Sequence, residues 1–129
     1  MMLVSVYEVQ AIPALYSLLS ERTPQQSISH KQMPSLSEHA AFVQSRPYEA
    51  WYMIVDGPGF VGSVYLSKQR EIGIFLFLNC QGCGYASWAV EEMKRLHPGK
   101  FLANVNPDNA PSIRFFERLG KRIQVTYEF

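Results

Sequence analysis

The sequence predicts an α+β fold in one domain, residues 1–129, with a mixed, mostly antiparallel sheet flanked by helices. Three consecutive segments rich in aromatic and β-branched side chains are joined by short turns, which is typical of an antiparallel meander. The third segment is followed by a glycine-containing loop, a segment with helical spacing and a further strand-like segment. A strand, helix, strand order implies a parallel pair, so we expect two parallel neighbours in this sheet.

Apolar alternation and helical spacing place the remaining elements along the chain. The expected elements are a strand over 3–9, a helix over 12–19, a loop over 25–35, a short helix after it, strands over 50–55, 60–66 and 71–78, a helix from about 84 to 97, a strand over 101–105, a helix over 110–119 and a strand over 123–129. No internal repeat interrupts this order.

Capping residues define the ends of three of these helices. Ser35 or Ser37 is expected to cap the short helix, which would carry Leu36, Ala40 and Val43 on its apolar face. The helix from about 84 ends where Pro-Gly follows, and the last helix has an asparagine cap, a proline in its first turn and a glycine after its end.

Composition argues against several functional classes. Twelve basic and eleven acidic residues give a net charge of +1 with no basic stripe, so we expect no nucleic-acid partner. The apolar N-terminus carries Glu8 and Pro13, and no run reaches the length of a membrane span, so we expect neither a signal peptide nor a membrane partner. Two cysteines three positions apart do not make a secreted disulfide framework, which indicates a cytoplasmic protein. Three scattered histidines and no second cysteine pair predict no metal site.

The segment 79–86, Asn-Cys-Gln-Gly-Cys-Gly-Tyr-Ala, is the strongest functional signal. Gly82 and Gly84 allow a tight turn and a close approach of the backbone to a ligand. The helix that follows directs its first free N–H groups and the positive end of its dipole outward. This pattern predicts a site for phosphate or pyrophosphate.

Three other interpretations of this loop remain open. A dinucleotide fold would use G-x-G-x-x-G, but this chain has Ser87 at the last glycine position and no acidic residue about twenty positions further on. Cys80 and Cys83 form a C-x-x-C at a strand-to-helix junction, as in redox proteins with a lowered thiol pKa. Alternatively, the glycines only make a turn and the thiols are small packed side chains.

Two motifs together resemble the GCN5-related N-acetyltransferase (GNAT) superfamily. Residues 81–86 match Q-x-x-G-x-A, the coenzyme A pyrophosphate loop of that superfamily. Residues 102–120 resemble its signature V-x-P-x-N-x-x-S-I-x-x-(Y/F)-E-K-L-G-F. The resemblance covers about residues 50–129 and implies a GNAT fold in which the parallel strand pair splays apart.

The resemblance also implies an acetyl-CoA-dependent N-acetyltransferase. Its cofactor, acetyl-CoA, would enter the splayed gap, pair its pantetheine with main-chain groups of strand 71–78 and rest its pyrophosphate on the amides of the loop. Asn109 would lie near the pantetheine, or would only cap its helix. The implied cofactor-binding residues are Phe75, Leu76, Phe77, Gln81, Gly82, Cys83, Gly84, Tyr85, Ala86 and Asn109.

The catalytic residues implied by the family are only partly present. Glu71 matches the general-base glutamate of some members, or it is a solvated glutamate at a strand edge. Phe116 stands where many members have a tyrosine that protonates the leaving thiolate, and a phenyl ring cannot do so. Tyr127, Tyr85, Cys83 or water could replace it, and of these we select Tyr127.

The acceptor is expected to be the primary amine of a small molecule. The segment 27–43 resembles the I-S-x-x-E-H-x-x-F segment of enzymes that acetylate nucleotide-linked amino sugars. His39, Trp51 and Tyr52 are nevertheless expected to be packed core residues. A protein or peptide amine as acceptor, a non-catalytic acyl-CoA-binding module and assembly as a homodimer all remain open.

Overall fold

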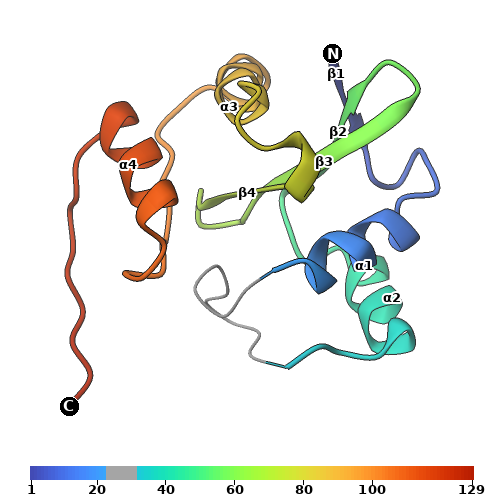
Figure 1. Cartoon of the computed structure of the whole chain (residues 1–129), viewed down its shortest axis with the longest axis horizontal. Coiled ribbons are helices and arrows are strands. Elements are labelled where there is room, and N and C mark those ends of the chain that lie inside the picture. The colour runs from blue at the N-terminus through green and yellow to red at the C-terminus, as the bar shows by residue number, and fades with distance from the viewer. Residues whose placement is uncertain (23–31) are drawn as a thin grey trace.

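The computed structural model describes residues 1–22 and 32–129, and these form an α+β structure around one antiparallel sheet (Figure 1). The strands lie in the order β1-β2-β3-β4, as the predicted meander requires. The elements are β1 (Met2–Ser5), α1 (Ile12–Ser20), α2 (Leu36–Gln44), β2 (Ala50–Asp56), β3 (Gly59–Leu66), β4 (Ile72–Leu76), the 3₁₀ turn η1 (Leu78–Cys80), α3 (Tyr85–Leu96) and α4 (Ala110–Leu119).

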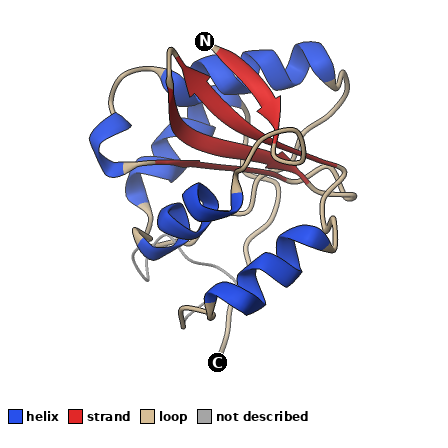
Figure 2. Cartoon of the chain, turned by 90° about the vertical axis from the view of Figure 1, so that its right-hand side faces the viewer, coloured by secondary structure: helices blue, strands red, loops and turns tan. Residues whose placement is uncertain are grey.

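Helices lie on both faces of the sheet (Figure 2), and each face buries an apolar cluster. Helices α1 and α2 cover one face, where Leu15 and Val43 pack with Met53. Helix α3 covers the other face, where Met93 packs with Ile54. Successive strand residues point to opposite faces, so the neighbours Met53 and Ile54 are both fully buried. Burial of each such side chain contributes roughly 1.5–3 kcal/mol.

Helix α2 begins with a capping box built on Ser35. The Ser35 hydroxyl accepts a hydrogen bond from the Glu38 N–H at 3.1 Å, and the Ser35 N–H donates to the Glu38 carboxylate at 3.0 Å. Its buried residues are His39 and Val43, as expected of both. The prediction for Leu36 was wrong, because Leu36 lies in the first turn, where the described residues leave its side chain 53% exposed.

The expected strand over 101–105 is reduced to one parallel bridge, between Glu71 and Leu102. The Ile72 N–H donates to the Leu102 carbonyl at 2.7 Å, and the Leu102 N–H donates to the Arg70 carbonyl at 2.8 Å. The parallel direction is therefore as predicted, but no ladder follows it in the described residues. This segment is therefore attached to β4 at one end only, and no backbone hydrogen bond joins the two segments beyond Leu102 in the described residues.

The side chain of Arg70 fixes this point of attachment. Its guanidinium donates to the carbonyl of His97 at 2.9 Å, of Pro98 at 3.3 Å and of Lys100 at 2.9 Å. It also lies over the Phe101 ring at 4.7 Å. These carbonyls belong to the C-cap of α3 and to the residues after it, so Arg70 places the chain that leaves α3 beside the start of β4.

The predicted strand over 123–129 is not formed. Its apolar residues alternate as a strand requires, but Ile123 is 67% exposed and Tyr127 83%. The segment leaves α4 and extends away from the sheet (Figure 1). A strand needs a neighbour for its main-chain hydrogen bonds, and the described residues provide none along this segment.

The strand predicted over 3–9 is also shortened. The Val6 N–H still donates to the Trp51 carbonyl at 3.1 Å, but the Glu8 N–H donates to the Ser5 carbonyl at 3.0 Å and closes a turn. Most of the loop expected over 25–35, with Ser27 to His30 of the amino-sugar resemblance, lies outside the described residues. Within the described ranges, no helix has the length and apolar character needed to cross a membrane.

The stability of this fold should fall on mild acidification because of His97. Its Nε2 shares a 2.7 Å hydrogen bond with the Tyr52 hydroxyl, and burial, aided by the charge of Arg70, lowers the pKa of His97. The unfolded chain therefore binds this proton more readily, so stability is full above about pH 6.5 and falls below it. We expect the Tm of His97→Gln to fall less than that of the wild type between pH 7 and pH 5. Parallel Tm curves for the two proteins would contradict this assignment.

Candidate functional site

The loop before α3 turns through two glycines with left-handed backbone conformations. The φ angles of Gly82 and Gly84 are +78° and +82°. A Cβ added to either glycine would meet no heavy atom within 4 Å, and residues 81–84 are all exposed. The backbone conformation therefore favours glycine at both positions, and the space beside them is open to a ligand.

The first amides of α3 have no capping side chain. Gly84 is the N-cap, and the first helical hydrogen bond runs from the Trp88 N–H to the Gly84 carbonyl at 3.1 Å. The N–H groups of Tyr85 and Ala86 are therefore not used by the helix itself. With the helix dipole behind them, they suit a phosphate or pyrophosphate. The loop residues predicted from the sequence are thus brought together: Gln81, Gly82, Cys83, Gly84, Tyr85 and Ala86.

The outer edge of β4 presents main-chain groups beside this loop. The Phe77 N–H donates to the Val61 carbonyl at 3.0 Å, towards β3, whereas the Ile72 N–H donates outward to Leu102. Main-chain direction alternates along a strand, so Leu76 faces outward as Ile72 does. Among the described residues, the only outer backbone neighbour of β4 is Leu102. Ile74 and Leu76 are therefore the residues of β4 whose N–H and C=O face the gap, by which we mean the space between β4 and the segment that follows Leu102.

This alternation distinguishes the three strand residues predicted to bind the pantetheine. Phe75 lies opposite Ser63 in the register with β3, so the main chain of Phe75, like that of Phe77, is directed into the sheet. Phe75 and Phe77 can contribute side-chain contacts, whereas Leu76 can also contribute hydrogen bonds. The strand could be predicted from the sequence, but the direction of each residue's N–H and C=O groups depends on the register with β3.

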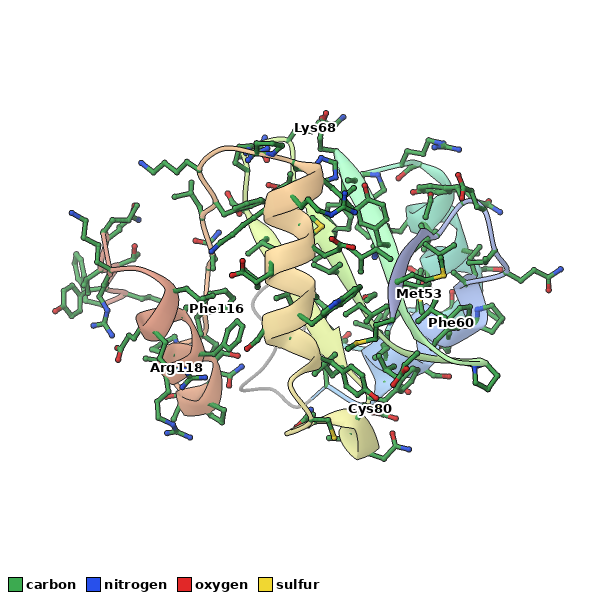
Figure 3. All side chains as sticks on the ribbon, turned by 90° about the horizontal axis from the view of Figure 1, so that it is seen from above. Met53, Phe60, Lys68, Cys80, Phe116 and Arg118 are labelled. Carbon is green, nitrogen blue, oxygen red and sulfur yellow. The ribbon has the colours of Figure 1, made fainter. Side chains whose placement is uncertain are left out.

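Helix α4 borders the gap with an apolar surface. The Asn109 Oδ1 accepts a hydrogen bond from the Ser112 N–H at 3.3 Å, which confirms the expected cap. Phe116 is half-buried and points from α4 towards the interior of the molecule (Figure 3). It packs edge-on against Phe115, with the ring centroids 5.1 Å apart. Phe116 therefore supplies an apolar contact and no proton donor.

Glu71 is held at the start of β4 by three hydrogen bonds, of which one joins its carbonyl to the Ser67 N–H at 2.8 Å. Its carboxylate accepts from the Asn104 amide at 2.5 Å, and its N–H donates to the Ser67 hydroxyl at 3.0 Å. Glu71 and Phe75 share one face of the strand but are roughly 13 Å apart along it. From this position the carboxylate can receive a proton from the gap through water, or directly from an acceptor that lies along this face.

Tyr85 connects the loop to the turn between β2 and β3. Its hydroxyl donates to Asp56 at 2.5 Å, and this hydrogen bond raises the pKa of Tyr85 to about 12. Tyr85 therefore retains its proton and is a poor donor to a thiolate. The structure does not bring Tyr127 to the gap either, because Tyr127 lies in the exposed segment after α4.

The Cys80 thiol does not have the lowered pKa that the redox interpretation of this loop requires. Both thiols of the loop are free, and Cys83 is exposed. Burial raises the pKa of Cys80, and Cys83 and the carboxylates of Glu21 and Asp56 raise it further. A redox or nucleophilic thiol requires the opposite shift. In the described part of the chain, no group of three or more His, Cys, Asp or Glu residues could hold a metal ion.

A cavity that the sequence did not reveal lies between the α1 and α2 layer and the sheet, with a volume of about 340 Å³. The end of α1 fixes its position relative to β4. The Glu21 carboxylate accepts from the Leu78 N–H at 2.8 Å, and the Arg22 guanidinium lies over the Phe75 ring at 4.1 Å. The cavity thus borders Phe75 on one face of the sheet, while the gap is at the strand's outer edge.

Most of the cavity wall is aromatic. The rings of Tyr48 and Tyr65 are stacked, with centroids 3.9 Å apart and planes within 5°. Burial raises the pKa of both phenols, so both stay protonated at neutral pH. Trp51 is buried, as expected, yet it also lines the cavity. From the sequence these aromatic residues indicated strands, and only the tertiary structure shows that they share a cavity.

Comparison with known proteins agrees with this geometry. A sequence profile described as "Acetyltransferase (GNAT) domain" matches residues 3–122. No protein of curated function matches the sequence at the significance threshold.

Three solved structures illustrate the similarity in fold. A domain from Methanocaldococcus jannaschii has a TM-score of 0.77 at 22% identity, over 98% of this chain and 92% of its own. The ribosomal-protein-alanine N-acetyltransferase from Brucella melitensis has a TM-score of 0.70 at 17% identity, over 93% and 83%. A chimeric spermidine N-acetyltransferase from Vibrio cholerae has a TM-score of 0.70 at 16% identity, over 93% and 81%. At these identities the likeness establishes the fold alone.

The thiol chemistry of the loop provides a test that needs no substrate. Because the pKa of Cys80 is raised, we expect Cys80 to react with a thiol-specific reagent more slowly at pH 7 than an unperturbed thiol. Reaction of the Cys83→Ser variant isolates Cys80, and the Cys80→Ser variant serves as the comparison. Fast reaction of Cys80, with a reversible disulfide between the two thiols, would support the redox interpretation instead.

Proposed function

This chain belongs to the acetyltransferase (GNAT) family of N-acetyltransferases, and on that premise we propose that it transfers the acetyl group of acetyl-CoA to the primary amine of a small molecule. One observation carries the proposal: the uncapped amides of α3 lie next to the outward-facing main chain of Leu76. A single extended ligand with a pyrophosphate group can use both features.

The residues of the gap suit acetyl-CoA in charge and in shape. The amides of 81–86 would bind the pyrophosphate, and the open space beside Gly82 and Gly84 leaves room for it. The outward carbonyl of Leu76 would accept a hydrogen bond from the pantetheine, and Phe75 and Phe77 would pack against it. The side chain of Asn109 keeps an N–H₂ group that its capping bond does not use.

When bound, acetyl-CoA supplies a thioester whose acetyl carbon bonds to the amine nitrogen as the carbon–sulfur bond breaks, so that coenzyme A leaves as the thiol. The protein orients the amine towards the gap and donates the outward N–H of Leu76 to the carbonyl oxygen. Glu71 takes the proton that the amine must lose before it can attack, through water or directly.

No tyrosine replaces Phe116 as a donor to the thiolate in the described structure. Tyr85 is bonded to Asp56, and Tyr127 is exposed beyond α4. Tyr127 remains our prediction for this role only if the segment after α4 reaches the gap when substrates bind. Otherwise water supplies the proton, because a coenzyme A thiolate can leave without assistance.

The acceptor is a small-molecule amine, and a nucleotide-linked amino sugar is one candidate. His39 lies on the buried face of α2 and its ring is 5.5 Å from that of Tyr16, which supports a packing role. The solved enzymes named above act on ribosomal-protein alanine and on spermidine, so acceptors differ widely within this fold. An acyl-CoA-binding module without turnover is the alternative function.

A turnover screen tests the proposal. Purified protein is incubated with acetyl-CoA and amino sugars, nucleotide-linked amino sugars, amino acids, polyamines or peptides, and free thiol is measured. We expect amine-dependent release of thiol with at least one small amine. Binding of acetyl-CoA without turnover on any amine would favour the binding module, and turnover on peptides alone would assign a peptide acceptor.

The loop can be tested with a matched pair of glycine substitutions. Gly84 and Gly57 both have positive φ angles, +82° and +60°, and an added Cβ meets nothing within 4 Å at either. Gly84→Ala and Gly57→Ala should therefore each lose about 1–2 kcal/mol of stability. Only Gly84→Ala should weaken acetyl-CoA binding, measured by calorimetry, because its methyl group enters the anion site. Equal affinities in the two folded variants would contradict this site.

The base can be tested by replacing Glu71. Glu71→Gln should lower kcat by about 10²–10⁴-fold, with little change in acetyl-CoA affinity. Asn104→Ala serves as the control, because it removes the same hydrogen bond but keeps the carboxylate, and we expect a much smaller loss. Near wild-type turnover of Glu71→Gln across the pH range would show that another group accepts the proton.

A further inference from the structure

The cavity between the α1 and α2 layer and the sheet has a composition that the proposed function does not by itself explain. Its wall presents hydrogen-bond donors: the guanidinium of Arg22, the indole N–H of Trp51 and the phenol of Tyr65. The only carboxylate in the described wall belongs to Glu38, and it already accepts the capping bond from Ser35. The cavity is therefore rich in hydrogen-bond donors, and beside Arg22 it offers little to stabilise a positively charged group of a ligand.

Trp51 provides an independent indication that a ligand belongs here. The residue is 8% exposed, and its buried Nε1 has no hydrogen-bond partner among the described residues. Buried N–H groups without partners are rare, because leaving one unpaired costs the free energy of its desolvation. A ligand that carries an acceptor atom in the cavity would satisfy this donor.

The position of Arg22 restricts the acceptor further. Its guanidinium lies over the ring of Phe75, in the strand whose outer edge borders the proposed donor site. Burial lowers the pKa of Arg22, while the neighbouring phenols of Tyr65 and Tyr48 oppose that effect. A guanidinium remains charged under such conditions and matches the two oxygens of a carboxylate. An anion bound to Arg22 is thus close to the site of acetyl transfer.

The size and the walls of the cavity restrict what the rest of the ligand can be. A volume of about 340 Å³ is near the lower limit for small-molecule sites, so one ring-sized group fits. The rings of Tyr48, Tyr65 and Trp51 are apolar surfaces that suit an aromatic or aliphatic group. In a nucleotide-linked amino sugar, the nucleotide would have to lie outside.

We propose that the acceptor is an amino carboxylate with an apolar or aromatic side chain, whose carboxylate binds Arg22 and the indole N–H of Trp51 while its amine faces Phe75 and the gap. This inference rests on the proposed function, since it identifies the acceptor of the same reaction. In an α-amino acid, one carbon atom separates the amine from the carboxylate. Because the Arg22 guanidinium lies over the Phe75 ring, a carboxylate bound to Arg22 keeps the amine close to Phe75. A polyamine lacks the anion and would meet the guanidinium with a like charge.

The test compares acceptors that differ in one group. Wild-type protein is assayed with acetyl-CoA and phenylalanine, its aminophosphonate analogue, phenethylamine or spermidine. Phenethylamine keeps the ring and the amine but lacks the carboxylate. We expect kcat/KM for phenylalanine to exceed that for phenethylamine by about 10- to 150-fold, the scale of a lost hydrogen bond to a charged group. A phosphonate that equals the carboxylate would identify a general anion site, which also supports recognition by Arg22.

Two variants separate recognition from packing. Arg22→Gln should reduce kcat/KM for phenylalanine by a similar factor and leave phenethylamine and acetyl-CoA affinity nearly unchanged. Arg46→Gln is the matched control, because Arg46 also lies over a ring, that of Tyr7 at 4.0 Å, but does not line this cavity. Trp51→Phe keeps the aromatic wall and removes the indole N–H. It should cause a smaller loss of kcat/KM, confined to the acceptors that carry a carboxylate or phosphonate.

Three results would overturn the inference: equal activity on phenylalanine and phenethylamine, preference for spermidine, or an equal loss on both acceptors in Arg22→Gln. If no amine is acetylated, the proposed function fails and the cavity is tested by binding. In the presence of coenzyme A, calorimetry should then show tighter binding of N-acetylphenylalanine than of N-acetylphenethylamine. Equal or absent binding of the two would overturn the assignment of the cavity as well.

Discussion

The rest of the structure depends on one constraint, the attachment of the chain after α3 to the start of β4 and to no other part of that strand. Arg70 holds the carbonyls of His97 and Lys100, and a single bridge joins Leu102 to Glu71. Had a full ladder formed, the outer main-chain groups of β4 would be used within the sheet. Because the attachment ends at Leu102, the outward N–H and C=O of Leu76 remain available to a ligand.

The sheet also allows the two substrates of the proposed reaction to approach from different sides. In our proposal the donor lies along the outer edge of β4 and on the amides of α3, whereas the acceptor occupies the cavity formed by α1, α2 and one face of the sheet. Glu21 and Arg22 join these regions, because one is bonded to Leu78 and the other lies over Phe75. In the proposed reaction the end of α1 would set where the acceptor meets the donor, and its residues would determine specificity.

Local signals explain which parts of the fold could be predicted from the sequence. The glycines, caps and turn residues act within a few positions of the chain, so the loop at Gly84, the cap at Asn109 and the antiparallel meander were all predictable. The strands expected over 101–105 and 123–129 were predicted wrongly. Apolar alternation shows that a segment can form a strand, but it does not show that a neighbouring strand is within reach. The cavity between the α1 and α2 layer and the sheet escaped prediction for a related reason: Arg22 and Tyr65 both line it, but they come together only in the tertiary structure.

The measurement that tests the account most directly is amide hydrogen exchange by NMR, residue by residue, with and without acetyl-CoA. The outward amide of Leu76 and the first amides of α3, at Tyr85 and Ala86, should become protected when acetyl-CoA binds. The amide of Phe77 should change little, since it already donates to Val61 within the sheet. If acetyl-CoA binds at saturation and leaves Leu76 and Tyr85 unprotected, the gap beside β4 is not the donor site.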